Sequence, residues 1–428
     1  MKRLHDTDTV FGITRGVPLN YIHREVDDIF LKNLKKDKHI VLHGSSKQGK
    51  TSLVKKHLSD EVCLAINCEK KKSLNDIYIS ILKGANFNIE TESESSATSS
   101  HKTSIGLKVL SVIGLSHGIN AEKGFKSKSR RLEFDINNIN DVIKALDAVN
   151  FNKYIVLEDF HYLDEEIQAA FAFQLKVFNE RSRILFIILG VWLNQDRLSQ
   201  YNGDLAGRLC NISVDRWTAE DFKKVIGNGE TLLNVRFSTG IKEIIIESSF
   251  GSVAILQELC LEFCKENNIH DSQLEEVVLS KQVQVSKILA RWIDNQNSKF
   301  NSFLRRIIYE KGDEQGLYKA IIFCLLIADP EELTRGITLK SIFELSREFK
   351  SLAMLKAKDI EQALLNVKRM QMDHQIIPAL FEYDEEKRGL FIIDKFFFIW
   401  LANKNKYESM EEIGIDEELI ERYKLLKY

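Results

Sequence analysis

Short apolar runs recur along the first half of the chain, and each is long enough to form one buried strand. In the stretches between them, an apolar residue recurs every three or four positions, which is the pattern of an amphipathic helix. Strands that alternate with helices favour a parallel sheet covered on both faces, so we predict an α/β domain over residues 1–217. The predicted strands are His39–His43, Val62–Cys68, Tyr154–Leu157, Ile184–Leu189 and Cys210–Val214.

The helical pattern continues with little interruption over residues 218–310, which predicts a small helical lid domain. The last part of the chain, residues 311–428, begins with apolar helices. It then carries two short predicted strands, Ala379–Tyr383 and Gly389–Ile393, around a polar turn. Helices followed by a charged hairpin are typical of a winged helix-turn-helix. We therefore expect a winged-helix-like domain that ends in a C-terminal helix.

One segment interrupts the alternation in the first domain. Glu90–Ser100 is rich in Ser, Thr and Glu, which predicts a flexible loop. Ile105–Ile119 is apolar and punctuated by glycine, compatible with a hairpin, and residues 123–131 are the most basic stretch of the chain. We interpret residues 90–131 as an insertion in the sheet. Its basic end is either a patch for nucleic acid or a solvated loop.

The loop after the first predicted strand reads Gly-Ser-Ser-Lys-Gln-Gly-Lys-Thr, the phosphate-loop (P-loop) motif. Its glycines let backbone N–H groups surround phosphate oxygens, Lys50 reaches the β- and γ-phosphates, and the Thr51 hydroxyl ligates magnesium. A buried strand precedes the loop and a predicted helix follows it, which is the context that the motif requires. The sequence therefore predicts that ATP and Mg²⁺ are bound by Gly44, Ser45, Ser46, Lys47, Gln48, Gly49, Lys50, Thr51 and Ser52.

Two acids, Glu158 and Asp159, follow the strand Tyr154–Leu157, as a Walker B segment requires. In such a segment the first acid binds magnesium through water and the second polarises the attacking water. This order assigns Glu158 to the metal and Asp159 to catalysis. It is the reverse of the common Asp-Glu order, so an exchange of the two roles and slow hydrolysis both stay open.

The strand Val62–Cys68 lies between the two motifs, which leaves room for another strand to insert between the two functional strands. This arrangement resembles the additional-strand P-loop ATPases, including the AAA+ and STAND groups, over about residues 10–265. Tyr21–Phe30 is similar to the segment that packs near the adenine in AAA+ proteins of the origin-recognition type, which implies that Arg24 contributes to nucleotide binding. Gly203–Arg208 resembles the segment that carries an arginine finger in those families.

By that resemblance, Arg208 reaches the γ-phosphate of a neighbouring subunit, where negative charge develops in the transition state. The alternatives are a surface arginine or an arginine paired with Asp204. At two positions where these families usually carry a nucleotide-sensing residue, this sequence departs from the family pattern. The strand that ends at Gly190 has no Asn, Ser or Thr at the sensor position, and the lid segment Phe250–Ala254 matches neither the AAA+ arginine sensor nor the STAND Gly-x-Pro.

Members of this broad class act as switches: ATP binding closes the lid, subunits assemble and hydrolysis resets them. The resemblance implies a homo-oligomer that works with a separately encoded effector or sensor protein, and many bacterial members serve antiviral defence. A DNA-binding initiator, loader or transposition ATPase is the second hypothesis, with Lys358–Met370 as recognition helix and Lys387 and Arg388 in the wing. A nucleotide-bound scaffold with negligible turnover is the third.

Composition changes this picture little. Hydrophobic residues make up 44% of the chain and charged residues 29%, as in ordinary globular proteins. Sixty basic and 62 acidic residues give a formal charge of -2, so nucleic acid would need a local patch such as residues 123–131 or the winged helix. The six cysteines lack zinc-finger spacing, and no apolar run of about 18 residues is present. We expect a cytoplasmic protein without a membrane partner.

Overall fold

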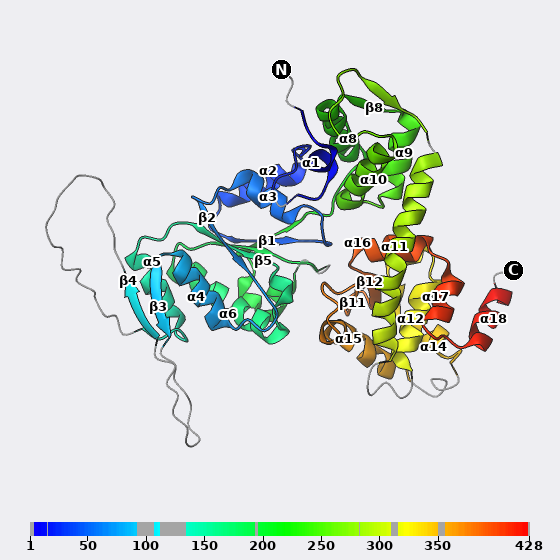
Figure 1. Ribbon diagram of the computed structural model, residues 1–428. Coiled ribbons are helices and arrows are strands. Elements are labelled where there is room, and N and C mark those ends of the chain that lie inside the picture. Colours follow the sequence, from blue (N-terminus) through cyan, green and yellow to red (C-terminus); the bar gives the residue numbers. More distant parts are fainter. Residues whose placement is uncertain are drawn as a thin grey trace.

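The structure, a computed structural model, describes residues 4–14, 16–91, 107–111, 134–192, 196–281, 283–309, 316–349 and 356–426. The basic stretch 123–131 and most of the predicted insertion lie outside these residues. The described chain forms three parts that follow one another in sequence: a sheet domain, a helical lid and a C-terminal region (Figure 1).

A five-stranded parallel sheet is the centre of the first domain, with the strand order β2-β5-β6-β1-β7. The α/β fold predicted from the sequence is therefore confirmed, and each predicted strand is found to within two residues at either end. β6 lies between β1 and β5, so the strands that carry the two nucleotide motifs are not adjacent. The strands are β1 (His39–His43), β2 (Cys63–Asn67), β5 (Tyr154–Glu158), β6 (Phe186–Leu189) and β7 (Leu209–Ser213).

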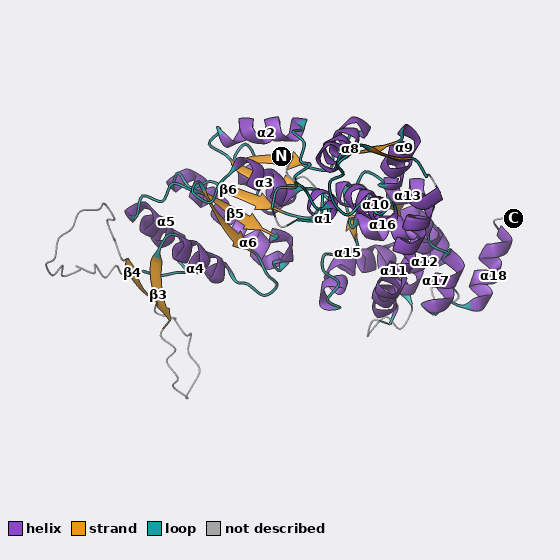
Figure 2. Ribbon diagram, turned by 45° about the horizontal axis from the view of Figure 1, so that its top comes forward, coloured by secondary structure: helices purple, strands orange, loops and turns teal. Residues whose placement is uncertain are grey.

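Helices cover both faces of this sheet (Figures 1 and 2). Each face buries its own hydrophobic cluster, which is why all five residues of β1 are buried although the strand is short. On one face lie α2 (Glu25–Leu34) and α3 (Lys50–His57), and on the other lie α4 (Leu74–Gly84), α5 (Ile139–Ala148) and α6 (Glu165–Arg181). The carboxyl ends of the strands are left uncovered by these helices and face the rest of the chain.

Of the hairpin predicted over Ile105–Ile119, the described chain contains residues 107–111, which form one strand. β3 (Phe87–Thr91) includes the first two residues of the Ser-rich segment 90–100, which was predicted as a loop, and pairs antiparallel with β4 (Leu107–Ser111). The strand pair therefore starts before residue 90 and brackets residues 92–106. The alternation in Phe-Asn-Ile-Glu-Thr is a strand signal, but five residues next to a polar run are too short to stand out in the sequence. Residues 112–133 lie outside the described chain.

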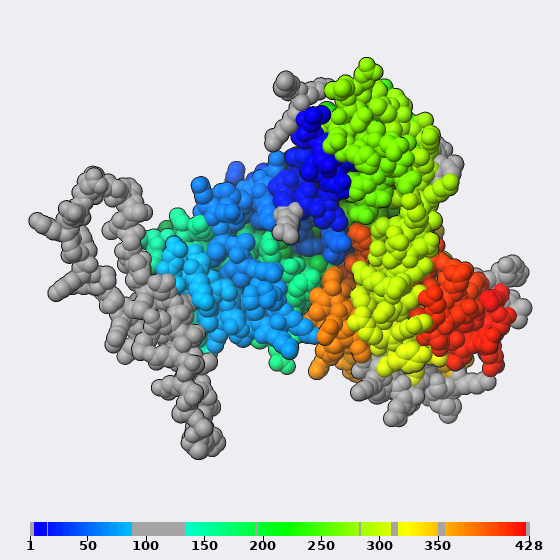
Figure 3. All heavy atoms as spheres, in the orientation of Figure 1, coloured from blue at the N-terminus to red at the C-terminus, as the bar shows by residue number. Residues whose placement is uncertain are grey.

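The lid consists of helices with one small addition, a pair of three-residue strands. These strands, β8 (Val235–Phe237) and β9 (Val277–Leu279), pair in parallel and are too short to be seen as a sequence pattern. The helix α1 (Thr7–Phe11) packs on α8 and α10 (Figure 3), so the start of the chain lies against the lid. The lid helices are α8 (Ala219–Leu233), α9 (Thr239–Ser248), α10 (Val253–Glu266) and the first part of α11 (Val283–Ile308).

The helix α11 runs from the lid into the C-terminal region (Figure 1). There β11 (Phe381–Asp384) and β12 (Gly389–Ile392) form the predicted antiparallel hairpin, and β10 (Ile337–Thr338) pairs with β12. Among the described helices, none is both long enough and apolar enough to cross a membrane. The remaining helices are α12 (Leu317–Ile327), α13 (Pro330–Arg335), α14 (Leu339–Ser346), α15 (Ala357–Asp373), α16 (Lys395–Asn403), α17 (Lys406–Glu412) and α18 (Glu417–Leu426).

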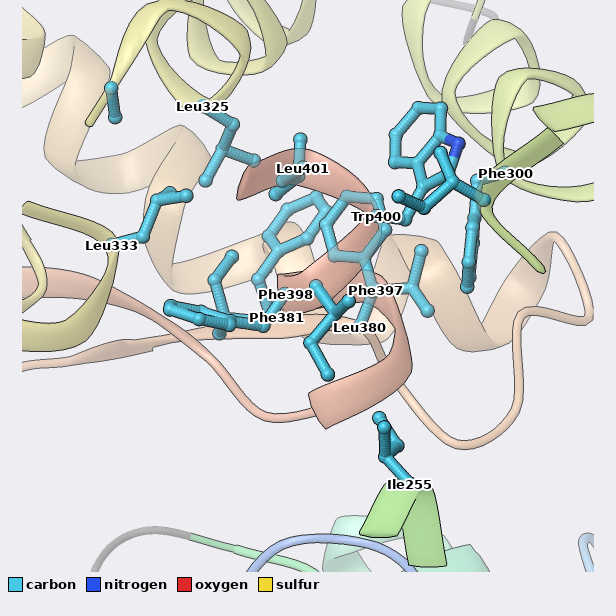
Figure 4. Packing of buried hydrophobic residues seen from close by; sticks show 14 of the residues in the cluster. Ile255, Phe300, Leu325, Leu333, Leu380, Phe381, Phe397, Phe398, Trp400 and Leu401 are labelled. Carbon is cyan, nitrogen blue, oxygen red and sulfur yellow. The ribbon is translucent and has the colours of Figure 1, made fainter. Parts of the chain in front are cut away.

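The lid and the C-terminal region share one hydrophobic core (Figure 4). The Phe300 ring of α11 lies 5.2 Å, centroid to centroid, from both Phe397 and Trp400 of α16. Ile255 of α10 belongs to the same cluster and approaches it from the lid side. Aromatic rings bury large areas and pack with defined geometry. This core therefore joins α10 and α11 of the lid to α16.

The packing of α1 on α8 leads to a first prediction. A Cβ atom on Gly229 of α8 would lie 2.2 Å from Cζ of Phe11, whose side chain is fully buried and has no room to withdraw. Gly229→Ala should therefore destabilise the lid by about 1–3 kcal/mol through overpacking. The measurement is the thermal unfolding temperature of wild type and variant.

Gly227→Ala is the matched control, because it lies two residues earlier in the same helix. Its added Cβ would meet only Glu230 Oε2, at 4.0 Å. Alanine favours helix over glycine by about 1 kcal/mol, so this variant should unfold at an equal or higher temperature. Equal effects of the two substitutions would contradict the packing of α1 on α8.

Candidate nucleotide site

The loop Gly44–Gly49 joins β1 to α3 and has the conformation that its glycines allow. Gly44 has φ 135° and Gly49 has φ 91°, a region that residues with a side chain seldom adopt. The helix α3 begins directly afterwards, at Lys50. The loop therefore presents backbone N–H groups and a helix N-terminus to an anion, as a phosphate site requires.

The Lys50 ammonium is half-buried against this loop. Its Nζ donates hydrogen bonds to the carbonyl oxygens of Gly44 (3.0 Å) and Ser45 (2.6 Å). Burial lowers the pKa of Lys50 to about 8, against the opposing influence of the Asp215 and Asp159 carboxylates. A desolvated cation that is held by neutral carbonyls gains from any anion that replaces them. The side chain is thus poised to bind phosphate.

Asp215, which the sequence pattern did not single out, holds the start of the loop. Both of its carboxylate oxygens lie 2.9 Å from the backbone N–H of Ser45, and Oδ2 also accepts the Ser45 hydroxyl at 3.1 Å. A Cβ atom on Gly44 would lie 2.6 Å from Asp215 Oδ1, so this contact depends on glycine. In the sequence, Asp215 directly follows a predicted apolar strand, and the same signal identified Glu158 and Asp159.

A cavity of about 330 Å³ opens beside the P-loop, a size within the range of small-molecule sites. The predicted residues Ser46, Lys47, Gly49, Lys50, Thr51, Ser52 and Arg24 all line it. Gly44 and Ser45 instead form the turn that Asp215 holds, and Gln48 faces the lid. The remaining walls come from the N-terminal segment (Gly12, Ile13, Thr14, Pro18, Asn20, Tyr21, Ile22), the strand ends (Asp159, Val191) and Trp217 with the lid (Val225, Val253, Ala254, Gln257).

Arg24 and Trp217 build one wall of this cavity. The Arg24 guanidinium lies 3.6 Å from the centroid of the Trp217 ring, and the indole in turn stacks on Phe222 at 5.4 Å. Arg24 Nη1 also donates to the carbonyl oxygens of Val214 and Arg216, both at 3.3 Å. Burial lowers the pKa of Arg24. The planar guanidinium that is fixed in this wall is suited to stack on a nucleobase.

The lid reaches the cavity through hydrogen-bonded amides that no motif revealed. Asn20 Nδ2 donates to Gln257 Oε1 (2.7 Å) and Gln257 Nε2 donates back to Asn20 Oδ1 (3.0 Å). Gln48 of the P-loop donates to the carbonyl of Gly251 (3.1 Å) and accepts from the backbone N–H of Val253 (3.4 Å). The lid therefore contacts the P-loop itself, although it lacks the sensor motifs of the resembling families.

The two Walker B acids lie differently with respect to the cavity. Asp159, in a left-handed conformation with φ 56°, lines it together with Lys50 and Thr51, whereas Glu158 is not among its described lining residues. Burial raises the pKa of both acids; Lys50 opposes this at Asp159 and Lys55 at Glu158. A hydroxyl and a carboxylate are the hard oxygen ligands that Mg²⁺ prefers, so Thr51 and Asp159 fit this ion.

Arg208 lies away from the cavity of its own chain. Its carbonyl accepts from the backbone N–H of His39 at the start of β1, while the P-loop follows the end of that strand. The guanidinium donates to Glu180 Oε1 (2.7 Å) and to the carbonyl of Asp204. Arg208 thus lies at the end of the sheet opposite the P-loop and does not line the cavity of its own chain.

The pKa of Lys50 leads to a second prediction. ATP should bind to the protonated form, so affinity should be constant below pH 8 and fall above it by up to about tenfold per pH unit. The measurement is calorimetric titration with MgATP between roughly pH 7 and 9.5, where a phosphate with a pKa near 6 is already ionised. Lys50→Ala should bind weakly and without this dependence. A flat wild-type profile would contradict the prediction.

Comparison with known proteins adds a structural likeness. No protein-family model and no curated protein matches the chain. Among solved structures, it is similar to a Walker-type ATPase of Pyrococcus abyssi, with a TM-score of 0.53 and 12% sequence identity over 92% of this chain and 99% of the other.

Two further structures align over nearly the whole chain at lower TM-scores. Cdc6 of Pyrobaculum aerophilum has a TM-score of 0.40 and 13% identity over 98% of this chain and 99% of its own. Orc1 of Aeropyrum pernix, solved in complex with DNA, has a TM-score of 0.45 and 11% identity over 99% of each chain. Together with the P-loop and Walker B geometry, the likeness to the Pyrococcus abyssi protein shows that this chain has the fold of a Walker-type P-loop ATPase.

Proposed function

We propose that this chain is an ATP-binding and ATP-hydrolysing switch of the AAA+/STAND kind, in which the nucleotide sets the positions of the lid and the C-terminal region. The observation that carries this proposal is the contact of the P-loop with both of these parts. Gln48 is hydrogen-bonded to the lid backbone, and the Lys47 ammonium lies 4.0 Å from the centroid of the Phe396 ring in α16. A loop that closes on phosphates displaces both contacts.

The chemistry follows from the residues around the cavity. Lys50 exchanges its loop carbonyls for the β- and γ-phosphates, and Thr51 offers a hydroxyl to magnesium. When bound, Mg²⁺ neutralises charge on the transferring phosphate. We assign Asp159 to the metal because it lines the cavity with Lys50 and Thr51. Glu158 then orients the attacking water, which is the exchanged assignment that the reversed acid order left open.

We further propose that copies of this chain assemble and act on a separately encoded effector or sensor protein. Arg208 supports assembly because it stands at the edge of the sheet opposite its own P-loop, in contact with Glu180. Release from Glu180 would free its guanidinium for the γ-phosphate of a neighbour. The resemblance to STAND ATPases suggests bacterial antiviral defence as the setting.

A DNA-dependent ATPase is the second candidate, because the C-terminal elements follow the order expected of a winged helix-turn-helix. In this reading α15 is the recognition helix and β11–β12 the wing. Clustered positive charge is needed for phosphate contact, yet four basic side chains here lie beside an acid. The pairs are Lys368–Glu382 (2.9 Å), Arg369–Asp373 (3.9 Å), Lys387–Asp384 (3.3 Å) and Arg388–Glu361 (3.2 Å).

The same motif packs against the ATPase domain. Arg197 of α7 (Arg197–Tyr201) donates to Glu382 at 2.9 Å, and Lys70 donates to the carbonyl of Met372 at 2.7 Å. Glu382 thus lies between Arg197 and Lys368, and a carboxylate shared by two partly buried cations is held in place. These contacts favour a protein-facing role for α15 over DNA binding.

The assignment of the two acids leads to a third prediction. Glu158→Gln should retain MgATP affinity within about threefold and slow steady-state phosphate release by about a hundredfold or more, because a water-orienting group is lost. Asp159→Asn should weaken binding of MgATP more than binding of ATP with EDTA, because a metal ligand is lost. Lys50→Ala supplies the background rate. The reverse pattern would restore the assignment of Glu158 to the metal.

Assembly is tested by mass in solution, measured by light scattering after size exclusion with ATP, with ADP and without nucleotide. We expect an ATP-dependent rise in mass that Lys50→Ala abolishes. Arg208→Ala should retain ATP affinity but lose the dependence of phosphate release on protein concentration, whereas Arg183→Ala, an exposed control, should resemble wild type. A monomer under every condition would contradict assembly, and release stimulated by DNA would favour the second candidate.

A further inference from the structure

Two histidines and an aspartate meet beside the wall of the nucleotide cavity. His57, the last residue of α3, has Nε2 at 2.7 Å from Asp27 Oδ1 in α2. His23, just before α2, has Nδ1 at 3.9 Å from the same oxygen. The three ligand atoms all lie within 4.8 Å of one another. The side chain of Asp27 is fully buried, while that of His23 is 54% exposed, so the cluster opens to solvent on one side.

We propose that His23 Nδ1, Asp27 Oδ1 and His57 Nε2 form a binding site for a divalent transition-metal ion of the Zn²⁺ class, with water in the fourth position. Imidazole and carboxylate are common ligands of such ions, and three protein ligands with one open position form a known arrangement. In a tetrahedral site with bonds near 2.0–2.1 Å, ligand atoms are about 3.3 Å apart. Asp27 Oδ1 lies 2.7 Å from His57 Nε2 and 3.9 Å from His23 Nδ1, so the two distances lie on either side of this value.

The surroundings of the cluster supply the outer contacts that metal ligands need. Asp28 Oδ1 lies 2.8 Å from His23 Nε2, so a carboxylate holds the ring nitrogen that does not face the cluster. Asp27 Oδ2 accepts from the backbone N–H of Arg24 (2.9 Å), and Tyr21 donates its hydroxyl to Oδ1. Burial disfavours ionisation of Asp27, but the hydrogen bonds from Tyr21 and His57 leave its pKa lowered.

The same atoms also form a hydrogen-bond network without a metal. In that network His57 carries its proton on Nε2 and donates it to Asp27, whereas metal binding requires the tautomer with the proton on Nδ1. The network joins the side chains of His57, Asp27 and Tyr21 to the backbone N–H of Arg24. His23 and Asp28 are exposed, and an exposed pair contributes little to stability. A contribution of His23 and Asp28 to Zn²⁺ binding therefore distinguishes the proposed metal site from the metal-free hydrogen-bond network.

A metal at this position would join two parts of the nucleotide site. Tyr21 and Arg24 line the cavity, and His57 ends the helix that starts at the P-loop. The ion would fix the distance between the cavity wall and this helix. The inference does not depend on hydrolysis or assembly, because it concerns only residues of α2, α3 and the segment before α2.

The test uses the full chain without an affinity tag, Zn²⁺ as the thermodynamic probe and Co²⁺ as the spectroscopic probe. We expect one equivalent of Zn²⁺ to bind by calorimetry and to raise the unfolding temperature. Co²⁺ should give the visible absorption of a four-coordinate site and be displaced by Zn²⁺. His23→Ala and His57→Ala should each abolish the Co²⁺ spectrum, and Asp28→Asn should weaken Zn²⁺ binding by about 10- to 100-fold.

His270→Ala is the matched control, because His270 is exposed and lies on the lid. It should bind Zn²⁺ as wild type does. His23→Ala keeps the test valid even if His57→Ala fails to fold, because His23 is on the surface. Absence of saturable Zn²⁺ uptake, or equal uptake by wild type and His23→Ala, would overturn the proposal. MgATP binding to the metal-free protein is measured in parallel, so a failure here is distinguishable from failure of the ATPase function.

Discussion

The site is built around a half-buried ammonium, that of Lys50, whose hydrogen bonds go to neutral carbonyl oxygens. Lys50 donates to the carbonyls of its own loop, and Asp215 holds the same loop by accepting from Ser45. Removing a cation from water is costly unless it is paired, so a phosphate that reaches Lys50 is strongly favoured. The strand order, the glycine conformations and the start of α3 all position this one charge.

The P-loop also lies at the junction of the three parts of the chain, and in the proposed switch this position converts phosphate binding into movement. Gln48 is hydrogen-bonded to the lid and Lys47 lies on Phe396 of α16. The lid and α16 share a core around Phe300, so in the proposed switch they move together. A packed core of this kind shifts as a unit and does not deform gradually. In the proposed switch, nucleotide occupancy is therefore transmitted to the C-terminal hairpin through this shared core.

The sequence predicts the five-stranded sheet and the nucleotide motifs well, because both have local signals: apolar runs, and glycines at fixed spacing before a helix. It also predicts the gap between β1 and β5 that β6 fills. It does not predict the pairs Asn20–Gln257 and Gln48–Gly251, which join residues more than two hundred positions apart. Asp215 has a weak local signal, and the three-residue strands of the lid have none, because tertiary contacts alone determine them.

The most direct measurement is a crystal structure with a non-hydrolysable ATP analogue and Mg²⁺. The account predicts that the triphosphate lies over residues 44–52, that Lys50 Nζ leaves the carbonyls of Gly44 and Ser45 for phosphate oxygens, and that Gln48 moves relative to Gly251. A nucleotide bound elsewhere, or one bound in the loop while Lys50 keeps both carbonyls and the lid stays in place, would contradict it.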